Sequence, residues 1–598
     1  MHRFGLLLAL TVTLAPHTAF AQTTCNVTHR IHQIQGNATT QLAGGVHDDV
    51  SPLNGQTVTI EGVVVADFQS LPQSTRSGEL RGFFVQEEAA DQDGDHSTSE
   101  GLFVFTGSAP SLDVQEGQRV CVRGPVSEFF GMTQVTATAA GSLVLTSASE
   151  PLPPAAPITL PVVGDLNDFY ERFEGMRVTF ASTLYVSEYF EAARYGQIVL
   201  TADGRPYHYS HVDTTPTAVE YAAFRDALAG LRIILDDDNN TQNAPLPAGK
   251  LFYPAPSGFG VGMQGPRFYR GGDTIDGLTG VLHWSFAGQS GTDAWRIRPT
   301  KTNPVVFAVG NPRPTHAPAK TGNVRVVGFN VLNYFNTIDT TSSNSSGPCG
   351  PSKTFDCRGA DSTAEFDRQN DKLVAALTEL DADVFGLVEL ENNGATIAPA
   401  IGELANRLNA KLMAPVYQHV LTGTVGTDAI TVGILYKAAN VFPVAAPAIL
   451  TAPEFTDPNN TGEQRNRPAV AQTFEVIGVT HPDRGAVFTV VVNHLKSKGA
   501  EGATGADVDQ LDGQSAWNDT RTKAARYWSR RGSRNSRKSI PTCSSLVIST
   551  LTVARRRSRR SKPRDIPTCT KHSRASMPIP TFSTASSAIW IMRCRVRR

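Results

Sequence analysis

Two things are scarce in this sequence of 598 residues: long apolar runs and, towards its end, acidic side chains. After the first 21 residues no stretch is apolar over the length that a membrane-spanning helix needs, so we expect no membrane span. Residues 526–598 contain one acid, Asp565, against sixteen Arg and three Lys. Because the whole chain has 54 basic and 55 acidic side chains, residues 1–525 keep 35 and 54, a net charge of −19. The sequence is therefore an acidic body followed by a basic tail.

The only long apolar run lies at the start of the chain. Basic His2-Arg3 precedes the apolar run Phe4–Leu14, and Ala19-Phe20-Ala21 follows. This order of charged, apolar and small residues is typical of a secretory signal. We expect Met1–Ala21 to be removed and the mature protein to be secreted or periplasmic; a buried N-terminal strand is the alternative.

Cysteine is also uncommon, and four of the seven cysteines precede residue 526. An even number in an exported chain indicates two disulfides. Cys349 and Cys357 share one short Gly/Ser/Asn-rich loop, so we expect them to pair with each other, which leaves Cys25 to pair with Cys121. Free thiols remain the alternative.

The first half of the chain has the pattern of two β domains, and its length allows three or four domains in all. Short β-branched runs bounded by glycine predict a small β-barrel over residues 22–150. Pro/Ala-rich Pro151–Pro161 reads as a linker, the strand pattern returns over 157–310, and 311–322 is a second linker with three prolines. Asp91–Asp95 lacks the spacing of an EF-hand, and we expect a solvated loop there.

From Asn323 onward the pattern changes to strands alternating with a helix. Val324–Tyr334 and Asp381–Glu389 predict buried strands, and Phe366–Leu380 between them places its apolar residues on one helical face. Val487–His494 predicts a further strand. Strand, helix, strand is the alternation of a layered α/β domain.

Each of these three strands delivers a polar residue at or near its carboxyl end: Asn330, Glu389 and His494. That end is where open α/β sheets place ligand sites. Taken singly, Asn330 would be interpreted as a loop cap, Glu389 as a solvated acid and His494 as a structural histidine. In their order and spacing they resemble the endonuclease/exonuclease/phosphatase superfamily, the fold of pancreatic deoxyribonuclease, and within it the secreted bacterial nucleases of the ExeM/NucH type.

The resemblance covers most of Cys25 to Ala525 and implies a multidomain chain. It implies N-terminal OB-like β domains, then an incomplete α/β four-layer sandwich over 323–525, followed by a basic disordered tail over 526–598. An OB barrel can bind single-stranded nucleic acid on its face, although the first barrel has no clear aromatic and basic face. A spacer role for the barrel is the alternative.

The resemblance also implies roles for the three strand-end residues. Leu387-Val388-Glu389 matches the family's strand-end signature, which makes Glu389 a metal ligand. Asn330 would orient the metal shell and the scissile phosphate, and His494 would donate to the phosphoryl oxygens or the leaving group. The implied cofactor is a divalent cation, Mg²⁺ first, with Mn²⁺ or Ca²⁺ as alternatives.

Basic residues near this trio are candidates for contacts to the phosphate backbone. Lys496 and Lys498 follow His494 directly, and Arg521 lies in the helix predicted to start at Asn518. Lys and Arg are the usual phosphate partners of nucleic-acid-binding proteins. We therefore expect a nucleic acid substrate, DNA or RNA, and a monomeric enzyme.

Beyond Ala525 the sequence departs from the superfamily. Neither its Gly-Asp-x-Asn strand end nor its late Asp-His pair, whose histidine is the general base, is present. A one-base shift of reading frame can account for both: re-read codons allow Ile540–Thr550 to become Asp-Pro-Asp-Val-Leu-Leu-Ile-Gly-Asp-Phe-Asn, and Ser583–Cys594 to include Leu-Asp-His. We therefore interpret the tail as frameshifted; a genuine basic arm for polyanions is the alternative.

The sequence thus predicts a secreted, divalent-metal-dependent endonuclease by descent that has little activity in this translated form. Two other hypotheses stay open. One keeps the fold and changes the substrate to a phospholipid or a small phosphate ester. The other is a non-catalytic nucleic-acid-binding protein that acts through its β domains.

Overall fold

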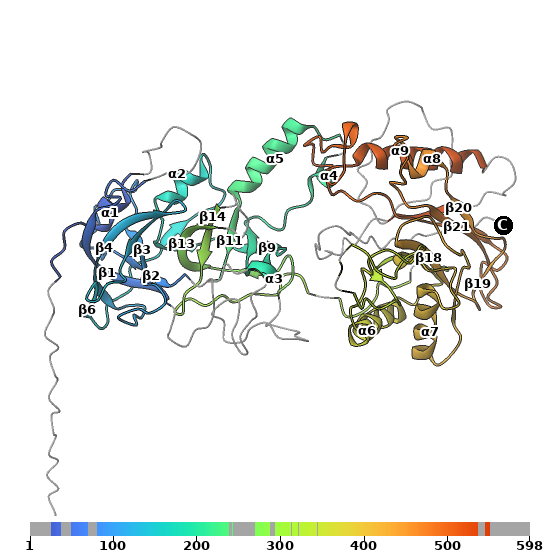
Figure 1. Ribbon diagram of the computed structural model, residues 1–598, viewed down its shortest axis with the longest axis horizontal. Coiled ribbons are helices and arrows are strands. Elements are labelled where there is room, and N and C mark those ends of the chain that lie inside the picture. The colour runs from blue at the N-terminus through green and yellow to red at the C-terminus, as the bar shows by residue number, and fades with distance from the viewer. Residues whose placement is uncertain are drawn as a thin grey trace, which may run out of the picture. The chain divides into compact units, whose positions relative to one another are not determined.

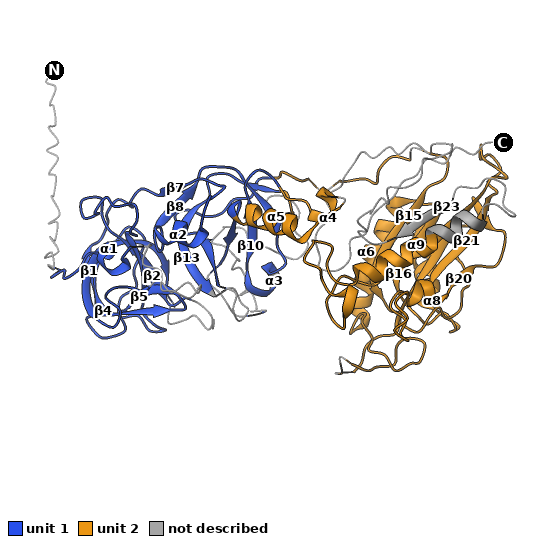
Figure 2. Ribbon diagram, turned by 90° about the horizontal axis from the view of Figure 1, so that it is seen from above, with its two compact units in different colours: residues 1–204, 230–269, 273–308 blue, residues 205–229, 270–272, 309–598 orange. Residues whose placement is uncertain are grey.

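The computed structural model describes residues 25–37, 50–69, 80–237, 242, 269–286, 293–535 and 545–549, with 214, 313, 321, 342 and 344 left out (Figure 1). The predicted signal Met1–Ala21 and most of the predicted tail lie outside these residues. The chain divides into two compact units (Figure 2), of which the first comprises 1–204, 230–269 and 273–308 and the second 205–229, 270–272 and 309–598. Residues 205–229 belong to the second unit although the domain boundaries expected from sequence place them in the second β domain.

The first unit begins with a closed β-barrel. Its strands are β1 (Thr57–Phe68), β2 (Gly82–Gln86), β3 (Gly101–Phe105), β4 (Arg119–Phe129), β5 (Met132–Thr136) and β6 (Leu143–Ser147), preceded by α1 (Ile31–Gln35). The order is β1-β2-β3-β5-β4-β6, and a further β1–β4 pairing closes the barrel. Gly124 lies where strands meet so closely that a Cβ would approach the Thr136 carbonyl oxygen to 2.0 Å. Cys25 is bonded to Cys121 on β4, one of the two pairs expected from the sequence.

An eight-stranded sheet makes up the rest of the first unit. Its elements are β7 (Ala156–Ile158), α2 (Leu166–Glu171), β8 (Arg177–Phe180), β9 (Leu184–Glu188), α3 (Ala192–Tyr195), β10 (Ile198–Thr201), β11 (Arg232–Leu235), β12 (Thr274–Ile275), β13 (Thr279–Phe286) and β14 (Asp293–Arg298). Asp236, which directly follows β11, is fully buried. It forms ion pairs with Arg296 and Arg298, also fully buried, because a buried carboxylate requires compensating charge.

The second unit contains two sheets. The first has the order β15-β16-β18-β17, with β15 (Val326–Tyr334), β16 (Val384–Glu391), β17 (Tyr417–His419) and β18 (Ile430–Lys437). The second joins β19 (Val441–Pro443), β21 (Ala469–Val476), β22 (Val487–Asn493) and β23 (Ser545–Ser549), with β20 (Ala448–Leu450) paired to β21. The helices of this unit are α4 (Tyr209–Val212), α5 (Ala218–Gly230), α6 (Thr363–Leu380), α7 (Ala400–Leu412), α8 (Pro453–Thr456), the 3-10 turn η1 (Gly505–Asp507) and α9 (Asn518–Asn535).

Apolar side chains hold these layers together. The predicted helix over Phe366–Leu380 is confirmed as α6, and its apolar face packs with α7 on one side of the first sheet. The other side of that sheet meets the second sheet through residues such as Val388 and Val490. Helices α8 and α9 pack on β21 and β22 through Phe455, Val491 and Ala524. None of the helices in the described part of the chain is long and apolar enough to cross a membrane.

The start of the predicted disordered tail is ordered, which corrects the sequence expectation. Residues 526–535 continue α9, and Ser545–Ser549 form β23, which pairs in parallel with β22. Asp507 caps the amino end of this helix: its carboxylate accepts hydrogen bonds from the amide and hydroxyl of Thr520 at 2.8 and 2.7 Å. The remainder of the tail, residues 536–544 and 550–598, lies outside the described residues.

Candidate active site

Glu389 stands at a distortion of its strand. The pairing of β16 with β18 slips between Val388 and Leu390, and Glu389 has a φ of +68°. A bulge re-aims a side chain, and a left-handed non-glycine residue costs about 1–3 kcal/mol, which structures tolerate mainly at functional sites. The Asn330 Nδ2 on neighbouring β15 donates to Glu389 Oε1 at 2.9 Å. The structure therefore brings these two predicted site residues into direct contact.

His494 reaches the same carboxylate from the other sheet. It directly follows β22, and its Nε2 lies 3.9 Å from Glu389 Oε1. Its Nδ1 is buried and has no hydrogen-bond partner among the described residues. Burial, with a smaller contribution from the Arg467 guanidinium, lowers the pKa of His494 to about 3. The imidazole is therefore neutral at neutral pH, and the three strand-end residues predicted from sequence converge on one carboxylate oxygen.

Positive charge is concentrated beside this trio. Arg467 Nη2 lies 2.8 Å from Asp428 Oδ2, and Arg358 Nη1 lies 3.7 Å from the other oxygen of that carboxylate. Burial lowers the pKa of Lys496, and the charges of Arg467 and Arg465 lower it further. Cations that destabilise one another in a partly buried setting favour an anionic ligand.

A buried indole supports two of these cations. The Lys496 ammonium lies 4.9 Å and the Arg465 guanidinium 5.0 Å from the ring centroid of Trp517, which is 2 % exposed. The Lys496 amide also donates to Asn466 Oδ1 at 2.9 Å. Lys496 is thus held in place at the site by both its main chain and its side chain.

Arg521 is a correction to the predicted phosphate contacts. Its side chain is buried, and its guanidinium donates to the main-chain carbonyls of Ser497, Ala516 and Gln514 at 3.2, 2.7 and 2.9 Å. Burial lowers its pKa to about 10. Arg521 therefore ties the segment containing Lys498 to the loop before α9 instead of facing a ligand. Lys498 itself is half-buried.

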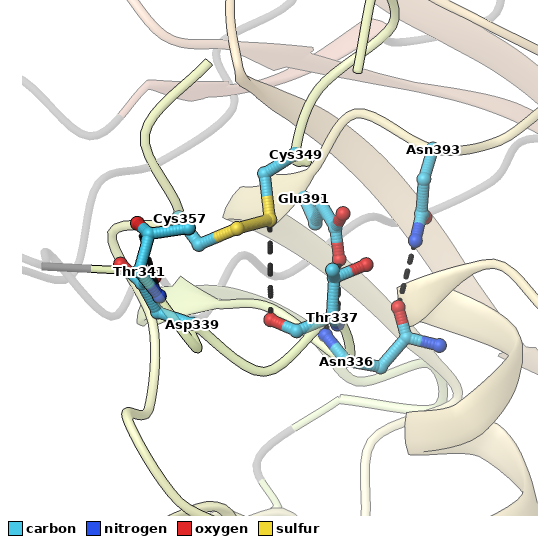
Figure 3. Close-up of a disulfide and its surroundings, with 8 residues drawn as sticks. All are labelled: Asn336, Thr337, Asp339, Thr341, Cys349, Cys357, Glu391 and Asn393. Atoms are coloured by element: carbon cyan, nitrogen blue, oxygen red, sulfur yellow. Dashed lines mark hydrogen bonds between the residues drawn. A yellow bond between two sulfur atoms is a disulfide. The ribbon is translucent and has the colours of Figure 1, made fainter. Parts of the chain in front are cut away.

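The second disulfide braces the loop after β15 (Figure 3). Cys349 and Cys357 are bonded, the other pair expected from the sequence. Glu391, two residues beyond Glu389, accepts hydrogen bonds from the amides of Asn336 and Thr337 at 3.1 Å each. Burial raises the pKa of Glu391. Glu391 is thus a structural carboxylate that fixes this loop to the end of β16.

The residues around Glu389 do not by themselves make a complete divalent-cation site. In the described chain, Glu389 belongs to no group of three acidic, histidine or cysteine ligands. A hard cation needs several oxygen ligands, with at least one or two carboxylates. The two groups that the described residues do form lie in the barrel: His32, Asp93 and Glu100, and Glu87, Glu88 and Asp91. Arg30 and Arg119 already pair with members of the second group.

Comparison with known proteins gives limited likeness. No protein-family model matches the chain, and no curated protein does. Among solved structures, it is similar to an endonuclease/exonuclease/phosphatase family protein from Bacteroides thetaiotaomicron (TM-score 0.22, 12% identity, 38% of this chain and 62% of that chain). It is also similar to the human Nocturnin catalytic domain with bound sulfate (TM-score 0.24, 12% identity, 41% of this chain and 69% of that chain). A third similar structure is a Bacteroides thetaiotaomicron mannosyl-6-phosphatase (TM-score 0.22, 12% identity, 38% of this chain and 64% of that chain). At these TM-scores the likeness assigns no activity, so function is inferred from the side chains of the site.

Sequence reasoning missed two arginines beside the site and the tryptophan ring that Arg465 and Lys496 contact. Arg465, Arg467 and Trp517 belong to no strand end, and Asp428 lies in a loop. The run Arg465-Asn466-Arg467-Pro468 directly before a β-type stretch is the signal that could have pointed to the two arginines.

Proposed function

We propose that the second unit is the catalytic unit of a secreted, divalent-metal-dependent endonuclease that hydrolyses phosphodiester bonds of nucleic acid. The observation that carries this proposal is the meeting of Asn330 and His494 on Glu389 Oε1, at 2.9 and 3.9 Å, beside a wall of cations. The helix–sheet–sheet–helix packing is consistent with the four-layer sandwich expected from the sequence. The closed barrel of the first unit is consistent with an OB-like module.

The residues of the site would have separate roles towards a bound phosphodiester. Arg467 and Lys496 neutralise the non-bridging oxygens, because the local charge is positive and partly desolvated. Asn330 holds the Glu389 carboxylate in position through its amide. The neutral His494 directs its Nε2 side towards Glu389, where its N–H can donate to a phosphoryl or leaving oxygen.

A divalent cation would supply further charge neutralisation and an activated water when bound. Among the described residues Glu389 belongs to no group of three ligands, and we assign no step to the cation in this chain. The sequence as translated also lacks the Asp-His pair that would act as general base. We therefore propose that the translated chain binds nucleic acid but turns it over slowly.

The test compares the translated chain with a frame-restored chain on supercoiled plasmid DNA, with Mg²⁺ or EDTA. We expect Mg²⁺-dependent nicking by the frame-restored chain and little by the translated one. Glu389→Gln in the restored chain should abolish nicking. Glu379→Gln, which changes a carboxylate exposed at 54 % in the same unit, is the matched control and should leave nicking unchanged. A restored chain that never nicks DNA, or a Glu389→Gln variant as active as its parent, would refute the proposal.

The closed barrel also favours a second candidate, non-catalytic retention of single-stranded nucleic acid. OB-type barrels bind single strands through stacking and charge. This candidate predicts that the full chain binds single-stranded DNA equally well with Mg²⁺ and with EDTA, that Glu389→Gln leaves binding unaffected, and that neither chain cleaves the strand. A frame-restored chain that cleaves the bound strand would contradict it.

A further inference from the structure

The short disulfide of the second unit joins the two loops that carry Arg358 and Asp428. Cys357 directly precedes Arg358 in the chain and is bonded to Cys349 (Figure 3). Both cysteines are buried, and they pack in one apolar cluster with Ala429, the residue that follows Asp428. The disulfide therefore holds the residue before Arg358 against the residue after Asp428.

The backbones of these two loops also approach each other closely. Gly350 has a φ of +72°, and a Cβ at this position would lie 3.1 Å from the Ala429 Cα. The Asn392 side chain donates to the Asp428 main-chain carbonyl at 2.9 Å, and the Asn392 amide donates to the Ala429 carbonyl at 2.8 Å. The loop that carries Asp428 is thus fixed both by the disulfide loop and by Asn392, which directly follows β16.

The two oxygens of the Asp428 carboxylate face two different guanidinium groups. Arg467 Nη2 lies 2.8 Å from one oxygen, and Arg358 Nη1 lies 3.7 Å from the other. The Arg467 side chain is 17 % exposed, whereas the Arg358 side chain is 43 % exposed. A separation of 3.7 Å is too long for a hydrogen bond, and Arg358 forms no hydrogen bond with any other residue of the described chain. Its guanidinium donors are therefore accessible to a ligand.

The second sheet places Arg467 beside His494. β21 and β22 pair in an antiparallel register, and beyond this pairing the Lys496 amide donates to Asn466 Oδ1 at 2.9 Å. The segment that contains Arg467 therefore runs alongside the segment that contains His494. Ion pairs thus connect Arg358, on the disulfide loop, with an arginine next to the histidine of the candidate active site.

We propose that Arg358 is a further substrate-binding residue, which contacts a phosphate of the nucleic acid strand next to the scissile phosphate. The inference rests on the proposed function, in which Arg467 neutralises the scissile phosphate. Because one carboxylate separates the two guanidiniums, they are placed for two neighbouring phosphates and not for one. This arrangement favours a polymer over a small ester with a single phosphate. A guanidinium suits this contact because its planar fork of donors matches two phosphate oxygens.

The experiment measures binding of a short fluorescent single strand to the full chain by anisotropy in EDTA, at several salt concentrations. Arg358→Ala should weaken binding about tenfold and lower the slope of log K against log salt by about 0.7. Arg358→Lys keeps the charge and loses the fork, so its affinity should lie between those of the parent and Arg358→Ala. Arg407→Ala is the matched control and should bind like the parent, because this arginine of α7 is 41 % exposed and pairs with Asp367 on α6.

The frame-restored chain separates a neighbouring phosphate from the scissile one. There Arg358→Ala should raise KM for DNA about tenfold and leave kcat unchanged, because a contact to a phosphate that does not react stabilises the bound substrate and the transition state equally. A fall in kcat at unchanged KM would place Arg358 at the scissile phosphate and contradict its assignment to a neighbouring one.

The role of the disulfide is tested by a cycle of variants. Cys349→Ser with Cys357→Ser should weaken strand binding, and Arg358→Ala should have a smaller effect in that background than in the parent. All chains are compared at a temperature below their melting transitions. An equal loss of affinity from Arg358→Ala in both backgrounds would show that the disulfide does not position Arg358.

The outcomes separate this inference from the proposed function. If Arg358→Ala binds the strand as tightly as the parent at an unchanged melting temperature, the inference is refuted, and nicking by the frame-restored chain still decides the proposed function. Equal weakening by Arg358→Ala and Arg407→Ala would show a general effect of surface charge and also refute the inference. If the parent binds no strand, the inference fails; if the frame-restored chain also does not nick DNA, the proposed function fails with it.

Discussion

The buried histidine of the site makes stability depend on pH in a defined way. His494 has a pKa of about 3 in the folded chain against an ordinary value of 6.5. Burial is the larger cause and Arg467 the smaller one. Because the folded pKa is depressed, the unfolded chain binds the proton more readily as pH falls from about 6.5 towards 3. The stability present above pH 6.5 is therefore lost through that window.

The size of the effect follows from the shift. Each pKa unit corresponds to about 1.36 kcal/mol, so lowering the pH from 7 to 4 should remove about 3 kcal/mol through His494 alone. The side chain is only 13 % exposed, so solvent screens little of this. His494→Gln has no titrating ring and should lose about 3 kcal/mol less than the parent over the same pH change. Arg467→Met should lie between them, because it removes only the smaller cause.

The measurement is urea unfolding at pH 7 and pH 4, on the parent, His494→Gln, Arg467→Met and the control His316→Gln. Other titrating groups are common to all four chains, so the difference between variants isolates His494. His316 is exposed at 83 %, and its variant should follow the parent. If parent and His494→Gln lose the same stability within about 0.5 kcal/mol, His494 is not the buried, neutral group inferred from the structure.

Three further predictions concern the scaffold. The double variant Cys349→Ser and Cys357→Ser should lower the free energy of unfolding by about 2.5 kcal/mol, since the disulfide closes a loop of sequence separation 8. The loss should appear as a lower urea midpoint at unchanged slope. Asp383→Asn should lower the free energy of unfolding by about 2–4 kcal/mol, because this buried carboxylate binds Lys320 and the Arg325 amide. DNA affinity should be unchanged, because Asp383 precedes β16 and lies away from Glu389. Equal urea midpoints for the variant and the parent would contradict this prediction. Arg521→Met should lower the free energy of unfolding by about 2–4 kcal/mol and speed amide hydrogen exchange over residues 511–517. Unchanged exchange over those residues would count against the bridging role of Arg521.

The sequence could predict the elements of the site because their signals are local. The strand that contains Asn330 and the helix Thr363–Leu380 follow from apolar periodicity within each segment. Polar residues at the ends of such strands must meet at one edge of the sheet, so the approach of Asn330 to Glu389 needed no long-range information. The sequence pattern made Glu389 a candidate, but its left-handed φ could not be predicted from any local signal.

The remainder depends on contacts that no local pattern encodes. Arg521 looks like any basic residue near a helix start, and only the fold shows that three carbonyls surround it. Arg467 gains its role from Asp428, 39 positions earlier in the numbering, and from His494. Residues 205–229 read as part of a β domain, because sequence gives no indication that Tyr209 meets Gly513.

The register of β23 bears on our interpretation that the tail is frameshifted. Ser545–Ser549 pair in parallel with β22, with Ile548 opposite Val492 and Ser549 opposite Asn493. The re-read frame that we interpret from the sequence allows aspartate at position 548, on the strand beside the one that leads to His494. Parallel neighbours end at the same edge of a sheet, so that carboxylate would stand at the edge where Glu389 and His494 meet. On that interpretation, a one-base shift of reading frame removes the second carboxylate and leaves the strand that carried it in place, which is why we expect the translated chain to keep its fold at this edge and lose its turnover.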